Sequence, residues 1–182
     1  MATVSAQHCE WHMRAATRGD VATIEALERR LFPDDAWSSE VITEEITHPS
    51  RSYWVIETAG QVIGYAGVMV VAETADVHNI AVLPDYEGQG IGSALLQQLH
   101  AEAIARGARE ILLEVRADNH RAQALYRKFA YTEIAVRPQY YPGGQDAVTM
   151  RAELTPSVAR STTDLTSHMT GAATHNDPTT LP

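Results

Sequence analysis

The sequence is poor in cysteine, lysine and long apolar runs. Cys9 is the only cysteine in 182 residues, which excludes an intramolecular disulfide and is typical of a reducing cytoplasm. Lys128 is the only lysine, and the 14 basic residues form no cluster of the kind that binds nucleic acid. No run of about 18 apolar residues predicts a membrane span. The segment from Met1 to Met13 lacks the basic and apolar regions of a secretory signal. We therefore expect a cytoplasmic protein with neither a membrane nor a nucleic-acid partner.

Acidic residues outnumber basic ones by 23 to 14, which gives a formal net charge of −9. Such a surface attracts a basic peptide or amine over long range, although acidity also serves solubility alone. The length fits one globular domain with one core. His8, Cys9 and His12 are too few and too poorly spaced for a zinc site, so no metal is predicted. No feature of the sequence specifies an oligomeric state.

The composition divides the chain into three zones. Residues 1–12 are polar and unpatterned, and we expect a flexible segment there. Residues 13–154 carry dense hydrophobic periodicity and form the predicted domain. Residues 155–182 are rich in Thr, Ser and Pro, and they cannot bury enough apolar surface to offset the entropy of ordering. A disordered tail is therefore predicted.

Within the domain, the periodicity predicts alternating helices and strands. Asp20 is expected to cap a helix that ends before Pro33, and a second short helix follows Ser38. An Ala59-Gly60 turn joins two strands into an antiparallel hairpin. The expected elements after the first two helices are strands 53–56, 62–70 and 76–82, a helix from about residue 90, a strand 111–115, a helix 119–129 and strands 131–136 and 145–150. The helix that begins near Gly90 places Ile91, Leu95 and Leu99 on one face. This order indicates an α/β fold with a mixed sheet.

A glycine-rich segment follows the third of these strands. Gly88, Gly90 and Gly92 allow a tight bend and the close approach of a ligand. Amides from Gly88 to Ser93 would then lie at a helix N-terminus, where an anion such as a pyrophosphate is favoured. A plain strand–helix turn is the alternative, because short glycine motifs often match by chance. The P-loop and dinucleotide patterns both fail: no lysine is present here, and the glycines follow the third strand rather than the first.

The wider pattern is more specific. Asn79-Ile80-Ala81-Val82, then Pro84, then Gly88-Gln89-Gly90-Ile91-Gly92 at a helix start resembles the acetyl-CoA motif of the GNAT superfamily. The blocks from Leu113 to Tyr126 and from Arg137 to Ala147 resemble the RimI-type ribosomal-protein alanine N-acetyltransferases. Together these motifs cover roughly residues 13–153.

The resemblance implies a mixed, mainly antiparallel twisted sheet flanked by helices and splayed at the acetyl-CoA site, with acetyl-CoA as co-substrate. It implies that the pantetheine arm follows the open strand edge and that the glycine turn holds the pyrophosphate. The implied cofactor-binding residues are Ile80, Ala81, Val82, Gly88, Gln89, Gly90, Ile91, Gly92, Ser93 and Asn119. Two positions depart from the family. Glu87 puts an anion where Gln or Arg is usual, and Ala130 replaces a glycine at a helix end, where a left-handed residue costs roughly 1 kcal/mol more.

Two side chains are candidates for proton transfer. Glu114 interrupts an apolar strand, with Arg116 on the same face, so it is either a surface carboxylate paired with Arg116 or a functional one. The resemblance implies that Glu114 is the general base. Tyr126 lies two helical turns after Asn119, a spacing that also suits a core tyrosine. The resemblance implies that Tyr126 protonates the departing thiolate.

The resemblance also implies the acceptor, which is a protein N-terminus and specifically the N-terminal alanine of a small-subunit ribosomal protein. Tyr140 and Tyr141, in the expected loop before the last strand, either line the acceptor groove or pack that loop. An α-amino group has a pKa near 8 and a lysine side chain has one near 10.4. Deprotonating the α-amino group at pH 7 therefore costs about 1 kcal/mol, whereas deprotonating a lysine costs more than about 4 kcal/mol. The alternatives are a lysine or small-molecule amine as acceptor, or a silent acetyl-CoA-binding module, against which Glu114 and Tyr126 argue.

Overall fold

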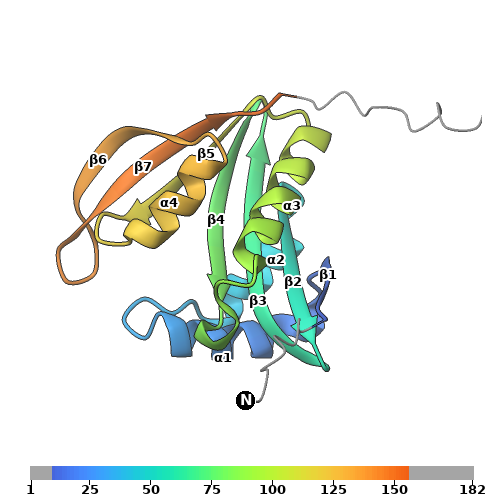
Figure 1. The fold of residues 1–182 in the computed structure, drawn as a ribbon. Helices are drawn as coiled ribbons and strands as arrows, with labels where there is room; N and C mark the ends of the chain where they lie inside the picture. Colours follow the sequence, from blue (N-terminus) through green and yellow to red (C-terminus); the bar gives the residue numbers. More distant parts are fainter. Residues whose placement is uncertain (1–9, 156–182) are drawn as a thin grey trace, which may run out of the picture.

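The computed structural model describes residues 10–155, which form one mixed sheet with helices on both faces (Figure 1). The strand order in this part of the chain is β1-β2-β3-β4-β5-β7-β6. The elements are β1 (His12–Ala15), α1 (Val21–Leu31), α2 (Ser39–Thr47), β2 (Arg51–Thr58), β3 (Gln61–Val71), β4 (Thr74–Val82), α3 (Ile91–Ala105), β5 (Glu110–Arg116), α4 (His120–Lys128), β6 (Thr132–Tyr141) and β7 (Gln145–Glu153). The predicted α/β class and mixed, mainly antiparallel sheet are confirmed.

The N-terminal boundary of the predicted domain differs slightly from the structure. Strand β1 begins at His12, one residue inside the segment that composition marked as flexible, because a four-residue edge strand carries no periodic signal. The other residues of that expected segment up to 9, and the expected tail from 156 onward, lie outside the described residues. None of the helices in residues 10–155 combines the length and hydrophobicity that crossing a bilayer requires.

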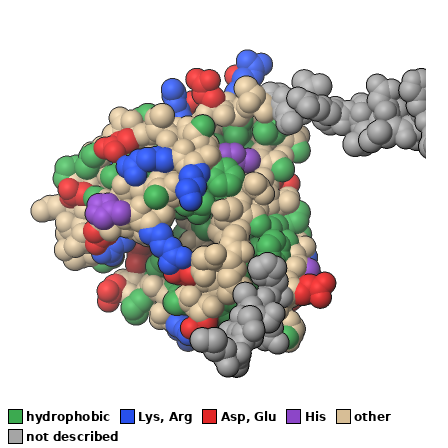
Figure 2. Space-filling model, viewed as in Figure 1, with side chains coloured by type: hydrophobic (Ala, Val, Ile, Leu, Met, Phe, Trp, Pro, Cys, Tyr) green, Lys and Arg blue, Asp and Glu red, His purple; other side chains and the backbone are tan. Residues whose placement is uncertain are grey.

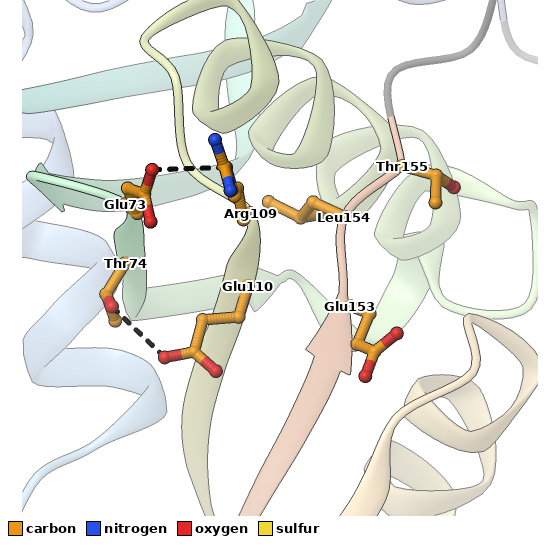
Figure 3. Close-up of a pocket in the computed structure, with 7 residues that line it drawn as sticks. All are labelled: Glu73, Thr74, Arg109, Glu110, Glu153, Leu154 and Thr155. Atoms are coloured by element: carbon orange, nitrogen blue, oxygen red, sulfur yellow. Dashed lines mark hydrogen bonds and ion pairs between the residues drawn. The ribbon is translucent and has the colours of Figure 1, made fainter.

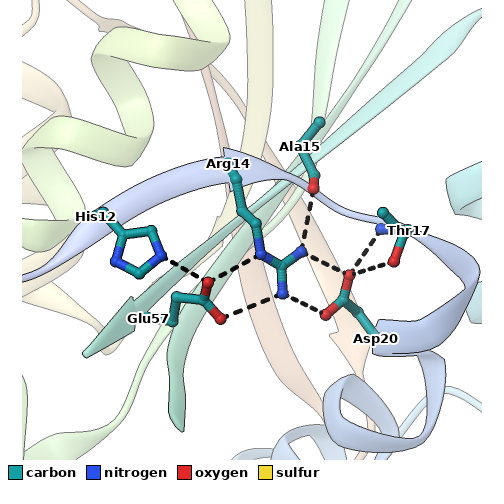
Figure 4. A network of polar contacts seen from close by, with 6 residues as sticks. All are labelled: His12, Arg14, Ala15, Thr17, Asp20 and Glu57. Carbon is teal, nitrogen blue, oxygen red and sulfur yellow. Dashed lines mark hydrogen bonds and ion pairs between the residues drawn. The ribbon is translucent and has the colours of Figure 1, made fainter. Parts of the chain in front are cut away.

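Asp20 stands at the N-cap position of α1 as predicted, but its side chain makes no capping hydrogen bond to that helix. Its carboxylate instead closes the short 3-10 turn Arg18–Asp20, where it accepts a hydrogen bond from the Thr17 amide at 2.7 Å. It also accepts two hydrogen bonds from Arg14, both at 2.8 Å, as Figure 4 shows. This bidentate ion pair is the stronger partner for a carboxylate, so the side chain is unavailable to the helix amides. The pair fastens strand β1 to the start of α1.

The hairpin between β2 and β3 is confirmed. Its two-residue loop has positive φ at both positions, 48° at Ala59 and 78° at Gly60, and the flanking residues Thr58 and Gln61 are paired. Positive φ at both central residues matches the right-handed twist of the strands and is the commonest geometry for so short a hairpin. The register of β2 against β3 therefore follows from local turn chemistry.

Strands β4 and β5 form the parallel pair of the sheet, and they stay together only briefly. Their pairing runs from Thr74–Glu110 to Asp76–Leu112, although β4 continues to Val82. A register shift between β3 and β4 lies just beyond that pairing, at Gly67/Val68, and such a bulge bends its strand. Figure 1 shows the two strands diverging after this point. The expected splay is therefore present, and it opens the sheet in its middle.

The core lies on both sides of β3. Helix α3 packs on β2, β3 and β4, while α1 and α2 contact β3 and β2 from the opposite face. The predicted inward stripe of α3 is confirmed, since Ile91, Leu95 and Leu99 are at most 1% exposed. Burial on both faces explains why β3 reads as a continuous apolar run rather than an alternating one. This packing holds the glycine turn and the open part of β4 on a rigid base.

Candidate active site

The glycine turn provides unpaired amides at the start of α3. Gly88 and Gly90 have φ of 76° and 83°, a left-handed backbone that glycine adopts without strain. The first hydrogen bond of the helix runs from the Ala94 amide to the Gly90 carbonyl, so the three amides before Ala94 lack a partner within the helix. No heavy atom lies within 4 Å of the position that a Cβ would take at Gly90. The turn is thus an open cradle of donors at a positive helix end.

Two further residues of the predicted cofactor site, Gly92 and Asn119, lie around this turn. Gly92 faces Leu125 of α4, and an added Cβ would lie at the ordinary van der Waals distance of 3.5 Å from Leu125 Cδ2. Asn119 is exposed and caps α4, accepting a hydrogen bond from the Ala122 amide at 3.0 Å. The start of α3 therefore lies against α4.

The end of β4 carries an open backbone edge toward the splay. Ile80, Ala81 and Val82 pair with β3 on one side, but the pairing with β5 ends at Asp76. Their remaining backbone groups face the opening between β4 and β5. The short 3-10 turn Pro84–Tyr86 connects this extended edge to the glycine turn. An extended arm that ends in a diphosphate fits this combination of a strand edge and a helix N-terminus.

Glu87, the first departure from the family motif, has a partner. Its carboxylate forms an ion pair with Arg121, which extends from the first turn of α4. Both side chains are partly exposed, at 40% for Glu87 and 66% for Arg121. The acidic group beside the turn is therefore compensated by a cation that lies 34 residues away in the sequence.

Glu114 extends from the face of β5 opposite the core side chains Leu113 and Val115. Its side chain is 31% exposed and pairs with Arg137 Nη1 of β6 at 3.3 Å. The alternative that Glu114 pairs with Arg116 is wrong. Arg116 lies at the exposed end of β5 and instead binds Asp118, two residues further on, at 2.9 Å.

Thr149 of β7 lies directly opposite Glu114 in the antiparallel pairing. Its Oγ1 is buried and has no hydrogen-bond partner among the described residues. An unpaired buried hydroxyl is unusual, since most such groups are satisfied. Glu114 therefore has one ionic partner, Arg137 of β6, and lies opposite an unpaired hydroxyl, that of Thr149 on β7.

Tyr126 is buried in α4, at 8% exposure, with its ring 5.7 Å from that of Tyr131. In the described part of the chain its hydroxyl has no hydrogen-bond partner. Burial, followed by the nearby Tyr141, raises the pKa of Tyr126 to about 12. Burial also raises the pKa of Tyr141 to about 12, with further contributions from Tyr140 and Glu114. Tyr141 thus lies within electrostatic range of both Tyr126 and Glu114.

Tyr140 and Tyr141 belong to strand β6 and not to a loop as expected. The strand runs on to Tyr141 because β6 and β7 form a hairpin closed by the left-handed Gly143 and Gly144. A register shift with φ of 53° at Gln139 interrupts it and redirects the tyrosines that follow. Tyr140 is 48% exposed, with its ring centroid 5.1 Å from that of Tyr141.

Two buried glutamates beneath the sheet were missed by the sequence reasoning. Glu28 of α1 is 1% exposed and accepts hydrogen bonds from Tyr65, from Asn79 Nδ2 at 2.6 Å and from the Trp37 amide at 3.2 Å. Glu45 of α2 is 6% exposed and accepts from Tyr53 and His78, both at 2.8 Å. Their position on the apolar faces of α1 and α2 could have identified them, because a carboxylate buried on such a face needs a partner.

These glutamates connect the helices to β4 just before its open edge. Burial opposes a charge on Glu45, but hydrogen bonds from His78 and Tyr53 outweigh it and hold the pKa of Glu45 below its ordinary value. His78 and Asn79 are consecutive, yet both reach the helix side of the sheet because the bulge lies at this point of β4. The network therefore fixes where β4 departs from β5.

A surface cavity of about 430 Å³ lies at the opposite ends of β4 and β5, where the strands are still paired (Figure 3). Two of its carboxylates already have partners: Glu73 binds Arg109 at 3.1 Å, and Glu110 accepts from Thr74 at 3.1 Å. Within residues 10–155 no three His, Cys, Asp or Glu side chains come together as a metal site would need. The cavity is separate from the splay, which remains the candidate active site.

Known proteins share this arrangement. The acetyltransferase (GNAT) family profile matches residues 18–131. The N-alpha-acetyltransferase RimI of Mycobacterium tuberculosis is 39% identical over 145 residues, which are 76% of this chain and 90% of that protein. The crystal structure of the ribosomal-protein-S18-alanine N-acetyltransferase from Escherichia coli matches 83% of this chain and 98% of that chain, with a TM-score of 0.74 and 30% identity. Arabidopsis thaliana NAA60 in complex with acetyl-CoA shares the fold at 16% identity, with a TM-score of 0.73 over 80% of this chain and 99% of that one.

The splayed mixed sheet and its glycine turn thus define an acetyltransferase. More particularly, the chain belongs to the acetyltransferase (GNAT) family, whose profile matches well over half of it.

Proposed function

We propose that this enzyme transfers an acetyl group from acetyl-CoA to the α-amino group of a protein N-terminus, the N-terminal alanine of a small-subunit ribosomal protein being the acceptor. The observation that carries the proposal is the splay between β4 and β5, which leaves the backbone edge from Ile80 to Val82 open next to the glycine turn. The relatives from Mycobacterium tuberculosis and Escherichia coli, named for N-α- and S18-alanine acetylation, support this choice of acceptor.

The cofactor-binding part of the proposal follows the backbone. Bound acetyl-CoA supplies an activated acetyl thioester. The free edge of Ile80 to Val82 would hold its extended arm, and the amides from Gly88 to Ser93 would hold its diphosphate. Backbone amides near Val82 would polarise the acetyl carbonyl, which favours attack by an amine.

Glu114 is proposed as the general base that takes a proton from the acceptor ammonium. Its partial exposure leaves room for an amine, and its partner Arg137 is 55% exposed and lies over the ring of Tyr140. The acceptor ammonium would replace the Arg137 guanidinium at the same carboxylate oxygen. A base of this kind must lie within hydrogen-bond reach of the proton it abstracts.

Tyr126 is proposed as the acid that protonates the departing thiolate. With its pKa raised to about 12, the hydroxyl keeps its proton at neutral pH. The absence of a hydrogen-bond partner for this hydroxyl among the described residues leaves its proton available to a ligand. The two proposed proton-transfer groups therefore come from β5 and α4, both in the half of the protein that contains β5 to β7.

Acidic side chains at the acceptor side favour a basic peptide. Asp34 and Asp35, in the segment between α1 and α2, lie within electrostatic range of Arg116 and Tyr141. On the face seen in Figure 2, basic and acidic side chains are interspersed rather than gathered into a basic patch. Both features suit a cationic peptide better than a nucleic acid.

The test is acetyl transfer to defined peptides, followed by mass spectrometry with fragmentation. One peptide begins with alanine and contains an internal lysine, and its control has the same sequence with the α-amino group already blocked. We expect one acetyl group on the alanine amine of the first peptide and none on the second. Acetylation of the lysine in both peptides would overturn the proposed acceptor, and a polyamine acetylated in place of either peptide would indicate a small-molecule enzyme.

A further inference from the structure

The entrance of the glycine turn carries a charge that opposes the proposed cofactor. Glu87 immediately precedes Gly88, and its backbone leads into the amides that face the diphosphate site. An uncompensated carboxylate directly before the glycine turn would repel a phosphate group bound there. The turn therefore needs a cation, and residues 84–93 contain none.

Arg121 of α4 is the cation that reaches this turn. One of its terminal nitrogens, Nη1, bonds Glu87. The other, Nη2, lies 4.0 Å from the position that a Cβ would occupy on Gly88, so the guanidinium also borders the glycine backbone. It belongs to the first turn of α4, whose positive end adds to the same field.

We propose that Arg121 is a cofactor-binding residue: it holds the Glu87 carboxylate away from the turn and donates hydrogen bonds to the diphosphate of acetyl-CoA. This inference rests on the proposed function. A guanidinium has five N–H donors in a planar fork, so it serves a carboxylate and a phosphate at the same time. Its 66% exposure leaves the outer donors free to face a ligand.

The two parts of this role predict different results in single and double variants. If Arg121 contacts phosphate, Arg121→Ala weakens binding even when Glu87 has been neutralised. If Arg121 only neutralises Glu87, Arg121→Ala has no effect in a Glu87→Gln background. We expect the first outcome, together with a larger loss in the single Arg121→Ala variant, where the free carboxylate also repels the ligand.

Titration calorimetry with CoA and with phosphate-free pantetheine tests this. We expect Arg121→Ala to weaken CoA binding about tenfold to a hundredfold. Glu87→Gln should tighten it slightly. Arg121→Ala with Glu87→Gln should remain several-fold weaker than Glu87→Gln alone. Pantetheine affinity should be unchanged throughout, because it lacks the diphosphate. The matched control is Arg127→Ala on the same helix, where the arginine bonds Gln123 and not the turn.

The controls also separate this inference from the proposed function. A wild-type protein that binds no CoA would overturn the proposed function itself. Wild-type binding with an unaffected Arg121→Ala variant would overturn only the role of Arg121. Equal losses for CoA and pantetheine would also overturn it, because they would show a general distortion of the site rather than lost contact with phosphate.

Discussion

The two halves of the sheet differ in how their carboxylates are buried and paired. In the half formed by β1 to β4, Glu28 and Glu45 are almost fully buried, and each accepts several hydrogen bonds from neighbouring strands and loops. In the half formed by β5 to β7, Glu114 has a single ionic partner, and the hydroxyls of Tyr126 and Thr149 have no hydrogen bond among the described residues. The two halves are joined by the short pairing between Thr74–Asp76 and Glu110–Leu112.

This contrast separates carboxylates that hold the fold from one that is available for chemistry. A buried charge with all its hydrogen bonds made is costly to disturb, because its removal leaves several donors unpaired. A partly exposed carboxylate with one partly exposed partner can exchange that partner for a substrate. The first half therefore acts as the scaffold, and the second half carries the groups that we propose to react.

The sharpest test of the contrast is Glu114→Gln. We expect kcat/KM to fall about 10²–10⁴-fold near neutral pH, the usual range for one proton-transfer group, with almost no change in melting temperature. The loss should be smaller above pH 8, where an α-amino group is already deprotonated. A pH series of initial rates with the alanine peptide measures this, and Glu110→Gln on the same strand is the control. Wild-type rates from pH 6 to 9 would show that the base lies elsewhere.

Tyr126→Phe tests the proposed acid on α4. We expect kcat to fall about 10²–10⁴-fold at every pH below about 12, because the hydroxyl of Tyr126 keeps its proton up to that pKa. Single-turnover rates with saturating acetyl-CoA measure the chemical step directly. Tyr131→Phe is the matched control, since it removes only the hydrogen bond to His100. A silent Tyr126→Phe variant would return this tyrosine to a packing role.

Glu28→Gln tests the scaffold half. The change weakens the hydrogen bonds from Tyr65 and Asn79, and we expect a loss of about 3 kcal/mol in the free energy of unfolding. That corresponds to a decrease of roughly 6–12 °C in melting temperature. Differential scanning calorimetry measures it, with the exposed Glu44→Gln as control. A stable variant with reduced turnover would contradict the assignment of Glu28 to the scaffold.

Acid should weaken the same half through Asp20. Hydrogen bonds from Arg14 lower the pKa of Asp20 to about 2, against about 3.8 in the unfolded chain. The folded state therefore binds fewer protons between these values, so this stabilisation of about 2 kcal/mol is complete above pH 4 and is lost as the pH falls toward 2. Urea unfolding at pH 6 and pH 2.5 measures the loss. Asp20→Asn should remove this part of the pH dependence, and an unchanged profile would contradict it.

The smallest effect is expected at the end of α4. Ala130 has φ of 63°, the left-handed conformation expected there, which glycine adopts at lower cost. Ala130→Gly should therefore raise the free energy of unfolding by about 0.5–1 kcal/mol. Ala124→Gly, at an exposed interior position of the same helix, should instead lower it by about 1 kcal/mol. Thermal unfolding of both variants decides the matter, and a destabilising Ala130→Gly would show that the backbone relaxes elsewhere.

Local patterns predicted much of this fold. The hairpin at Ala59-Gly60, the buried stripe of α3 and the left-handed Ala130 all depend on residues close together in the chain. Their conformations follow from φ preferences and hydrophobic periodicity. The predictions that failed were those in which a residue distant in the sequence competes with a local partner. The Asp20 side chain binds Arg14 instead of the α1 amides, and β6 continues through Tyr140 because β7 pairs with it.

The sequence by itself determined the family, the glycine turn and the identity of the two proposed proton-transfer groups, since each is encoded in a short run of residues. Only the tertiary structure decided how the charges combine. Arg137 and not Arg116 pairs with Glu114, and Arg121 compensates Glu87 from another helix. The physical reason is that Coulombic and hydrogen-bond partners are selected by distance in space, and the chain path around the splay brings together residues that sequence spacing cannot relate.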